Sequence, residues 1–549
     1  MKKMRISLVT MMVLLSAVMS AVPAHRHRCL LTLADGKTLA ATFRGDEHIH
    51  FYQADDGRCF QTDDEDVAHE VDGDSIMAAW TKRQAKAKET LGRRQARMKT
   101  NFGKRENPTY GTKRGLVILV EFPDVPFNFS KTDIDPLFNE KNHKDDVNSG
   151  SVHDYFYECS YGQFNFTFDV VGPVMMPQPL AYYGKNNTFG NDIRPATMAG
   201  EAIRSVAAGL DFHPYDWDDD GEVEQVFIIH SGYDEAQTRV NEQIWSHAWA
   251  LSEAQQDNDG NGPVMVDGLI IDKYATTAEL QGKSGHTLFG IGTACHEFSH
   301  CFGLPDTYNT VSQSQFCMDL WDIMDFGEYG GANLNGGTPT AYTAYERMFC
   351  GWLKPVVLDE PVYVKDMQPI TSAPEAYILY NSGMHDEYYL LENRQFEGFD
   401  TYLPGHGMLI THVDFDSDVW KENKVNNVYS HRRMIIIPAD NNLSIYNMAG
   451  DTWPGTTGNT ALTNKTSPAA TLYNRNANGN KFLDHEITDI EESADGLISF
   501  RFDGATDDDA IRAVKNHTMA PDVFYNTLGQ RVSGNYKGLL ITEGKTILK

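Results

Sequence analysis

The segment GTACHEFSHCFGLPD, residues 292–306, contains the pattern His-Glu-x-x-His, which is typical of zinc proteases. On a helix, His296 and His300 lie on one face and one turn apart, so an imidazole nitrogen from each can bind the same Zn²⁺. Glu297 lies beside the first of them. Its carboxylate can accept a proton from a metal-activated water and return that proton to a leaving amine. The segment therefore predicts a catalytic helix.

The same segment continues toward a third metal ligand. Gly303 follows His300 by three residues and can end the helix in a left-handed turn. Asp306 follows His300 by six residues, which is the spacing of the extended metzincin motif with Asp in place of the third His. Three protein ligands and one open position are typical of a catalytic zinc site. A downstream carboxylate, Glu328 or Glu346, is the alternative third ligand.

Two residues shortly after the motif fit the same site. Met324 lies in WDIMD, residues 321–325, and metzincins place a methionine in a tight turn beneath the zinc ligands. A lone methionine usually fills a core, but the position of Met324 after the motif favours the turn. Tyr329 is a candidate for stabilising the oxyanion of the reaction.

Several blocks in the same order resemble the immune inhibitor A family of secreted bacterial metallopeptidases. Besides the active-site block they are GLVILVEF (115–122), GSVHDYF (150–156), SYGQ (160–163), DWDDDG (216–221), GWL (351–353), LENR (391–394) and LPGHGMLI (403–410). The resemblance covers roughly residues 110–500. It implies a zinc endopeptidase that is made as a precursor, is secreted, and cuts protein or peptide substrates.

Two other classes of function stay open. One is a catalytically silent surface-binding protein that retains the peptidase fold, and the intact His296, Glu297 and His300 argue against it. The other is a zinc hydrolase that acts on a non-peptide substrate, against which the family blocks argue. The formal net charge of -29 argues against nucleic acid as a partner.

An acidic segment before a buried-type strand suggests a structural calcium site. Oxygen-bearing side chains alternate through this segment, and glycine stands at its sixth position, as in a calcium loop. The candidate ligands are Asp216, Asp218, Asp220 and Glu222. A complete calcium loop has Glu at its twelfth position, where this chain has Phe227, so an acidic turn is the alternative interpretation. Residues 256–262 form a second, weaker candidate.

The chain divides into several predicted regions. We expect an α/β (α+β) zincin- or metzincin-like catalytic domain with the active-site helix over residues 109–360, and a β-rich region over 361–503. In the latter, His406, His412 and Asp414 suggest a metal site, although hydrogen-bonded side chains are the favoured interpretation. Residues 25–108 are predicted to contain small β structure and a basic linker over residues 80–106, which is exposed to proteolysis. The family resemblance implies that this region is a propeptide.

The two ends of the chain carry targeting signals. Residues 1–24 have the basic start and short apolar run of a secretory signal peptide, and no later stretch is long and apolar enough to span a membrane. Residues 504–549 form an acidic linker and a short β tail. The tail resembles the sorting domains of the type IX secretion machinery, which implies a Gram-negative bacterium and a secreted or cell-surface protein.

The seven cysteines do not require a disulfide framework, because their number is odd and no Cys-x-x-Cys occurs. Cys295 and Cys301 flank the first and second histidines and are expected to be small buried hydrophobes. Cys29 or Cys59 is an alternative source of a thiol that covers the zinc in a latent precursor.

Overall fold

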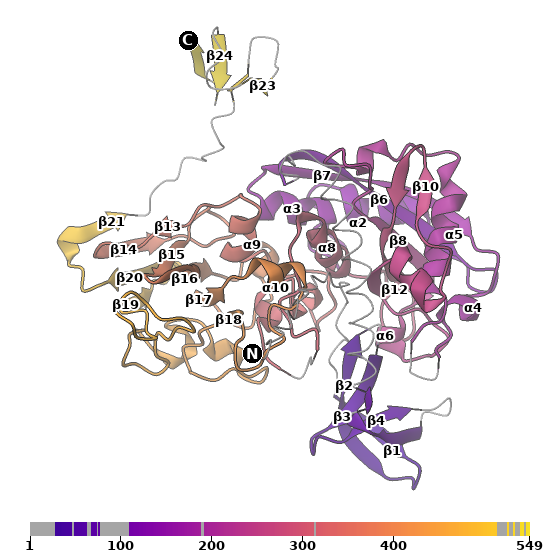
Figure 1. Cartoon of the computed structure of the whole chain (residues 1–549), viewed down its shortest axis with the longest axis horizontal. Helices are drawn as coiled ribbons and strands as arrows, with labels where there is room; N and C mark the ends of the chain where they lie inside the picture. Colours follow the sequence, from indigo (N-terminus) through magenta and orange to yellow (C-terminus); the bar gives the residue numbers. More distant parts are fainter. Residues whose placement is uncertain are drawn as a thin grey trace, which may run out of the picture.

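The computed structural model describes residues 28–46, 49–62, 67–73, 75–76, 109–187, 191–311, 315–512, 524–525, 531–532, 539–542 and 545–548. Its mixed α/β architecture, with several sheets and few helices, confirms the expected class of fold at that level (Figure 1). The predicted signal peptide and the basic stretch at 80–106 lie outside the described residues. Among the described helices, none has the length and apolar character needed to cross a membrane.

The first five strands close into a small barrel. They are β1 (Arg28–Leu33), β2 (Thr38–Asp46), β3 (Ile49–Ala54), β4 (Cys59–Thr62) and β5 (Val67–Val71). Successive strands are antiparallel, and a parallel pairing of β1 with β5 closes the barrel. The inward side chains, such as Leu31, Phe43 and Phe60, form its core.

A five-stranded sheet in the order β7-β6-β8-β12-β9 forms the centre of the next region. Its strands are β6 (Gly111–Glu121), β7 (Phe164–Met175), β8 (Val226–Tyr233), β12 (Lys273–Leu280) and β9 (His247–Ala250). All of them are parallel except the edge strand β9. A hairpin of β10 (Val264–Val266) and β11 (Leu269–Ile271) lies outside this sheet.

Helices cover both faces of this sheet, which explains the unbroken apolar run in β6. Val117 and Leu119 face the core that also contains residues of α2 (Lys131–Asn139), α3 (Val152–Cys159) and α8 (Gly292–Ser299). Leu116, Ile118 and Val120 face a second core, with α4 (Leu180–Gly184) and α5 (Pro195–Ala207). The sheet thus gives α8 a rigid apolar support.

The other helices are short. The α-helical ones are α6 (Glu235–Thr238), α7 (Leu251–Ala254), α9 (Ala344–Phe349) and α10 (Ser417–Lys421). The 3-10 turns are η1 (His213–Tyr215), η2 (Gln255–Asp257), η3 (His300–Phe302), η4 (Asp319–Trp321), η5 (Phe326–Tyr329), η6 (Gly398–Asp400), η7 (Met448–Gly450), η8 (Gly455–Thr457) and η9 (Asp507–Asp509).

Two sheets form the β-rich part of the chain. The first contains β13 (Val356–Val357), β15 (Tyr377–Asn381), β16 (Met384–Arg394), β17 (Gly407–Asp414) and β18 (Met434–Ile436). The second contains β19 (Ile487–Glu492), β20 (Ile498–Phe502), β14 (Val362–Met367) and β21 (Ala510–Arg512). Ile378, Leu390 and Leu409 of the first sheet belong to the same core as α8, so apolar packing is continuous across the predicted boundary at residue 360.

A last four-stranded sheet lies in the predicted tail. It is formed by β22 (Phe524–Tyr525), β23 (Arg531–Val532), β24 (Leu539–Thr542) and β25 (Lys545–Leu548). Its role in sorting stays a prediction.

Candidate metal centre and active site

Helix α8 and the turn η3 present the two histidines of the motif on one face. Residues 292–299 are α-helical, His300 begins η3, and Gly303 follows in the left-handed conformation with φ of 90°. The start of α8 packs closely on η5, because a Cβ at Gly292 would lie 1.8 Å from the carbonyl oxygen of Glu328. The chain after Gly303 turns back and brings Asp306 to the histidines.

The three predicted ligands converge at the distances that one small cation requires. The Oδ1 atom of Asp306 lies 3.2 Å from Nε2 of His296 and 3.5 Å from Nε2 of His300. The two Nε2 atoms are 3.3 Å apart. Tetrahedral ligands with bonds of about 2.1 Å to zinc are separated by about 3.4 Å. The spacing therefore fits a tetrahedral zinc site with one position left for another ligand.

Hydrogen bonds to backbone carbonyls set the orientation of both rings. Nδ1 of His296 lies 2.8 Å from the carbonyl oxygen of Ile323, and Nδ1 of His300 lies 2.7 Å from that of Leu304. A carbonyl only accepts, so Nδ1 carries a proton in each ring, and Nε2 is the nitrogen left to bind a metal ion. Oδ1 of Asp306 is buried and accepts no hydrogen bond. Two lone pairs and a buried carboxylate oxygen at one point form a donor set that fits a divalent metal.

Acidic side chains surround the first histidine of the motif. Burial lowers the pKa of His296, but Glu328, Asp306 and Glu297 outweigh burial and raise this pKa to about 10. Burial raises the pKa of Asp306, whereas His300 and His296 lower it to about 2. Burial raises the pKa of Glu328 to about 8. The raised pKa of His296 shows that its acidic surroundings favour a positive charge at this histidine, either a proton or a metal ion.

The alternative third ligands occupy different places. Glu328, on η5, is fully buried near His296 but does not belong to the group of ligand atoms that Asp306 forms with the two histidines. Glu346 caps α9, because its Oε2 accepts a hydrogen bond of 2.8 Å from the backbone N–H of Thr343. The structure therefore brings Asp306, rather than either glutamate, to the histidines.

Met324 lies in a buried turn that joins both ligand segments. The carbonyl of Ile323 in this turn orients His296, and the carbonyl of Met324 accepts a hydrogen bond of 2.8 Å from the N–H of Thr307. Asp322 stabilises the turn through the N–H of Met324 at 2.8 Å and the hydroxyl of Thr307 at 2.7 Å. The turn thus holds His296, the first candidate ligand, and Thr307, which directly follows the third candidate ligand Asp306.

A cavity of about 220 Å³ lies at the start of α8. Thr293, one turn before Glu297 on the same helix, lines it together with Tyr329. Asp234 and Gln237 line it from the segment of α6. The cavity therefore lies at the N-terminal end of the helix that carries His296 and Glu297.

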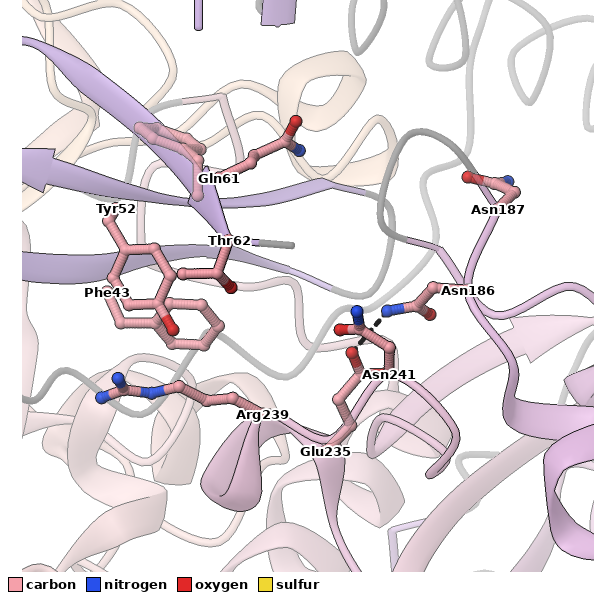
Figure 2. Close-up of a pocket in the computed structure, with 10 residues that line it drawn as sticks. Phe43, Tyr52, Gln61, Thr62, Asn186, Asn187, Glu235, Arg239 and Asn241 are labelled. Atoms are coloured by element: carbon pink, nitrogen blue, oxygen red, sulfur yellow. Dashed lines mark hydrogen bonds between the residues drawn. The ribbon is translucent and has the colours of Figure 1, made fainter. Parts of the chain in front are cut away.

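The N-terminal barrel packs on the segment that contains α6. Ala236 and Trp245 of this segment belong to the core of the barrel. The guanidinium of Arg239 lies 5.5 Å from the ring centre of Phe43 and 5.0 Å from that of Tyr52 (Figure 2). Both contacts have cation–π geometry. The barrel therefore covers the outer side of a segment whose first residues line the cavity at α8.

Two of the four predicted calcium ligands lie together. Asp216 and Asp218 form a group of potential ligands with Glu224, whereas Asp220 and Glu222 are outside that group. Burial removes water from the carboxyl of Glu224 and raises its pKa to about 8. Glu224 was not selected from the sequence, although it continues the alternation of acidic residues toward β8. The calcium site stays a prediction, which calorimetric titration with Ca²⁺ would test.

The other acidic and histidine candidates have structural partners. Asp259, in the weaker calcium candidate, accepts hydrogen bonds of 2.7 and 2.9 Å from the first N–H groups of α5. His412 pairs with Glu387 at 2.9 Å, and His406 pairs with Glu492 at 2.7 Å. These contacts agree with the favoured non-metal interpretation of the β-rich region.

The cysteines carry no disulfide among the residues that the structure describes. Cys295 is fully buried and Cys301 is partly buried. Cys29 and Cys59 lie on strands of the barrel, where their sulfur atoms face the backbone oxygens of Ala41 and Gly57. Within the described ranges, no group of potential metal ligands includes either thiol.

Comparison with known proteins identifies the class. Residues 104–353 match the family described as immune inhibitor A peptidase M6, catalytic domain. The match confirms the resemblance noted in the sequence over this segment and supports a metallopeptidase catalytic domain there.

Two curated relatives are similar over the same share of the chain. The pre-pro-metalloprotease PrtV of Vibrio cholerae serotype O1 is 24% identical over 278 residues, which are 43% of this chain and 29% of the relative. Immune inhibitor A of Bacillus thuringiensis subsp. alesti is 24% identical over 273 residues, 43% of this chain and 39% of the relative. The chain thus covers well under half of the length of either relative.

Proposed function

We propose that the chain is a secreted, zinc-dependent endopeptidase that hydrolyses peptide bonds of extracellular proteins. The observation that carries the proposal is the convergence of His296, His300 and Asp306 at 3.2–3.5 Å with both Nδ1 atoms engaged by carbonyls. The turn at Met324 beneath these ligands supports a metzincin-like catalytic domain. The family match of residues 104–353 supports the peptidase class.

The residues around the metal have separate roles in this proposal. Zinc, when bound, supplies a Lewis acid that lowers the pKa of water toward neutrality. Glu297, buried beside the first ligand, accepts the proton of the water that attacks the peptide carbonyl. It then gives this proton to the leaving nitrogen as the C–N bond breaks. Tyr329 lines the cavity at the start of α8, and its hydroxyl is proposed to stabilise the oxyanion.

Removal of the metal tests this proposal directly. We expect a zinc chelator to abolish casein and gelatin hydrolysis, and zinc to restore it, because the open fourth position exists only in the metal-loaded site. The measurement is the rate of hydrolysis against zinc content. Full activity in zinc-free protein would contradict the proposal. Zinc-loaded protein that stays inactive, even after proteolysis between residues 80 and 108, would favour the surface-binding protein.

We further propose that residues 1–24 are a signal peptide and residues 25–108 a propeptide, and that the tail serves export from a Gram-negative cell. The barrel supports the second point, because it packs on the α6 segment, which also lines the cavity at α8. Proteolysis at the basic linker would then release the barrel and open this side of the cavity.

A single arginine offers a test of the propeptide. We expect Arg239→Gln to raise the activity of the uncleaved protein about 5- to 30-fold, because two cation–π contacts worth about 0.5–1 kcal/mol each hold the barrel. After limited trypsin cleavage, the variant and the wild type should be equally active. Arg194→Gln is the matched control, since Arg194 stacks on Tyr182 and not on the barrel. A wild type that gains nothing from cleavage would contradict the propeptide.

A further inference from the structure

A segment of the β-rich part lies against the loop that carries Asp306. This asparagine segment, residues 423–427, follows α10 and precedes β18 in the chain. It contacts residues 306–310 through side-chain amides, over a separation of 117 residues along the chain. Residues 104–353, which match the peptidase family, do not include it.

Asn423 holds Asp306 with both atoms of its amide. Its Oδ1 accepts a hydrogen bond of 2.6 Å from the backbone N–H of Asp306, and its Nδ2 donates to Oδ2 of the same residue. These two bonds fix the carboxylate and its backbone together. They leave Oδ1 of Asp306 as the oxygen that faces His296 and His300. The side chain of Asn423 is buried, so water competes little for these bonds.

The rest of the asparagine segment holds the residues that follow Asp306. Nδ2 of Asn426 donates to the carbonyl of Thr307 at 2.6 Å, and the carbonyl of Asn426 accepts from Nδ2 of Asn309 at 2.9 Å. Oδ1 of Asn427 accepts from the N–H of Thr310 at 2.9 Å. Residues 306–310 belong to no helix or strand, so these amides satisfy backbone groups that regular structure would otherwise pair.

We infer that Asn423 is a positioning residue for the metal centre and that the asparagine segment completes the site from the β-rich part. The inference rests on the proposed zinc function, with Asp306 as third ligand. A carboxylate that binds a metal is normally held by a hydrogen bond to its other oxygen, which fixes its direction. Asn423 supplies that bond, so the catalytic segment without the β-rich part lacks the support of its third ligand.

The choice of variant follows from the backbone of Asn423. Its φ is 49°, a left-handed conformation that asparagine and glycine adopt more readily than other residues. Asn423→Gly therefore removes the amide without straining the backbone. Asn441→Gly is the matched control, because Asn441 is exposed in the same part of the chain with φ of 57°.

The test uses the full chain and measures zinc affinity by competition with a chromophoric chelator. We expect Asn423→Gly to raise the dissociation constant of zinc about 10- to 100-fold, as substitutions behind metal ligands do. Cobalt substituted for zinc should show an altered visible spectrum in this variant, because the third ligand is no longer fixed. Asn441→Gly should match the wild type in both measurements.

Three outcomes would overturn the inference in distinguishable ways. If Asp306→Ala loses zinc while Asn423→Gly keeps the wild-type affinity and cobalt spectrum, the zinc function stands and the positioning role fails. A lower melting temperature of metal-free Asn423→Gly, with unchanged zinc affinity, would likewise assign Asn423 a purely structural role. If Asp306→Ala keeps its zinc, the proposed ligand set itself is wrong.

Discussion

Glu297→Gln is expected to lower kcat for casein hydrolysis by about 10²–10⁴-fold, the usual contribution of a general base. Zinc content should stay at the wild-type level, because the three proposed ligand atoms come from His296, His300 and Asp306. The substitution keeps the size and polarity of the buried side chain but removes its ability to take a proton. Activity and bound zinc are measured on the same preparation.

The position of Glu297 makes this result specific. It lies on α8 directly after His296 and one turn after Thr293, which lines the adjacent cavity. Glu360→Gln, at an exposed glutamate near β14, is the matched control and should leave activity unchanged. A Glu297→Gln protein that keeps both zinc and full activity would exclude Glu297 as the base. Loss of zinc together with activity would instead assign this carboxylate a part in binding the metal.

The local part of the site could be predicted from the sequence because helix geometry fixes it. His296 and His300 are four residues apart, and Gly303 ends the helical turn that precedes Asp306. Over such a short span, spacing determines which side chains can converge. The capping role of Glu346 could also be predicted from the sequence, since Thr343 and Glu346 have the spacing of a capping box.

Contacts of the site that join residues far apart in the chain could not be predicted from sequence spacing. Asn423 lies 117 residues from Asp306, and asparagine is common in turns, so nothing in its sequence surroundings marks it. The packing of the barrel on Trp245 and Arg239 depends equally on contacts between distant segments. Glu224 falls outside the positions that the calcium-loop pattern defines, so the pattern does not indicate that this residue lies beside Asp216 and Asp218.

The core that the predicted catalytic and β-rich regions share could not be predicted from the sequence either. The predicted regions meet at residue 360, yet the sheet of β15, β16 and β17 shares apolar packing with α8. Figure 1 shows α8 close to the β-rich part as well as to β6 and β8. Apolar strands look alike whether they pack on their own sheet or on a neighbouring domain, so pattern alone does not reveal the shared core.

Asp306→Ala is expected to raise the dissociation constant of zinc by more than about 100-fold and to abolish peptidase activity at limiting zinc. Substitutions behind a ligand already cost about 10–100-fold in affinity, and this one removes a ligand itself. It also leaves Asn423 without the carboxylate to which it donates. Equilibrium dialysis against buffered zinc measures the effect, with activity assayed at each zinc concentration.

Three further substitutions separate the charge of Asp306 from its shape and from the neighbouring carboxylates. Asp306→Asn keeps the shape but lacks the negative charge, so its zinc affinity should also fall. Glu328→Gln and Glu346→Gln should keep near wild-type zinc content, because Glu328 lies outside the group of ligand atoms and Glu346 caps α9. If Glu328→Gln loses zinc while Asp306→Ala retains it, the third ligand is Glu328. The site would then belong with zincins that bind the metal through two histidines and a glutamate, and the hydrogen bonds of Asn423 would serve only to hold the loop.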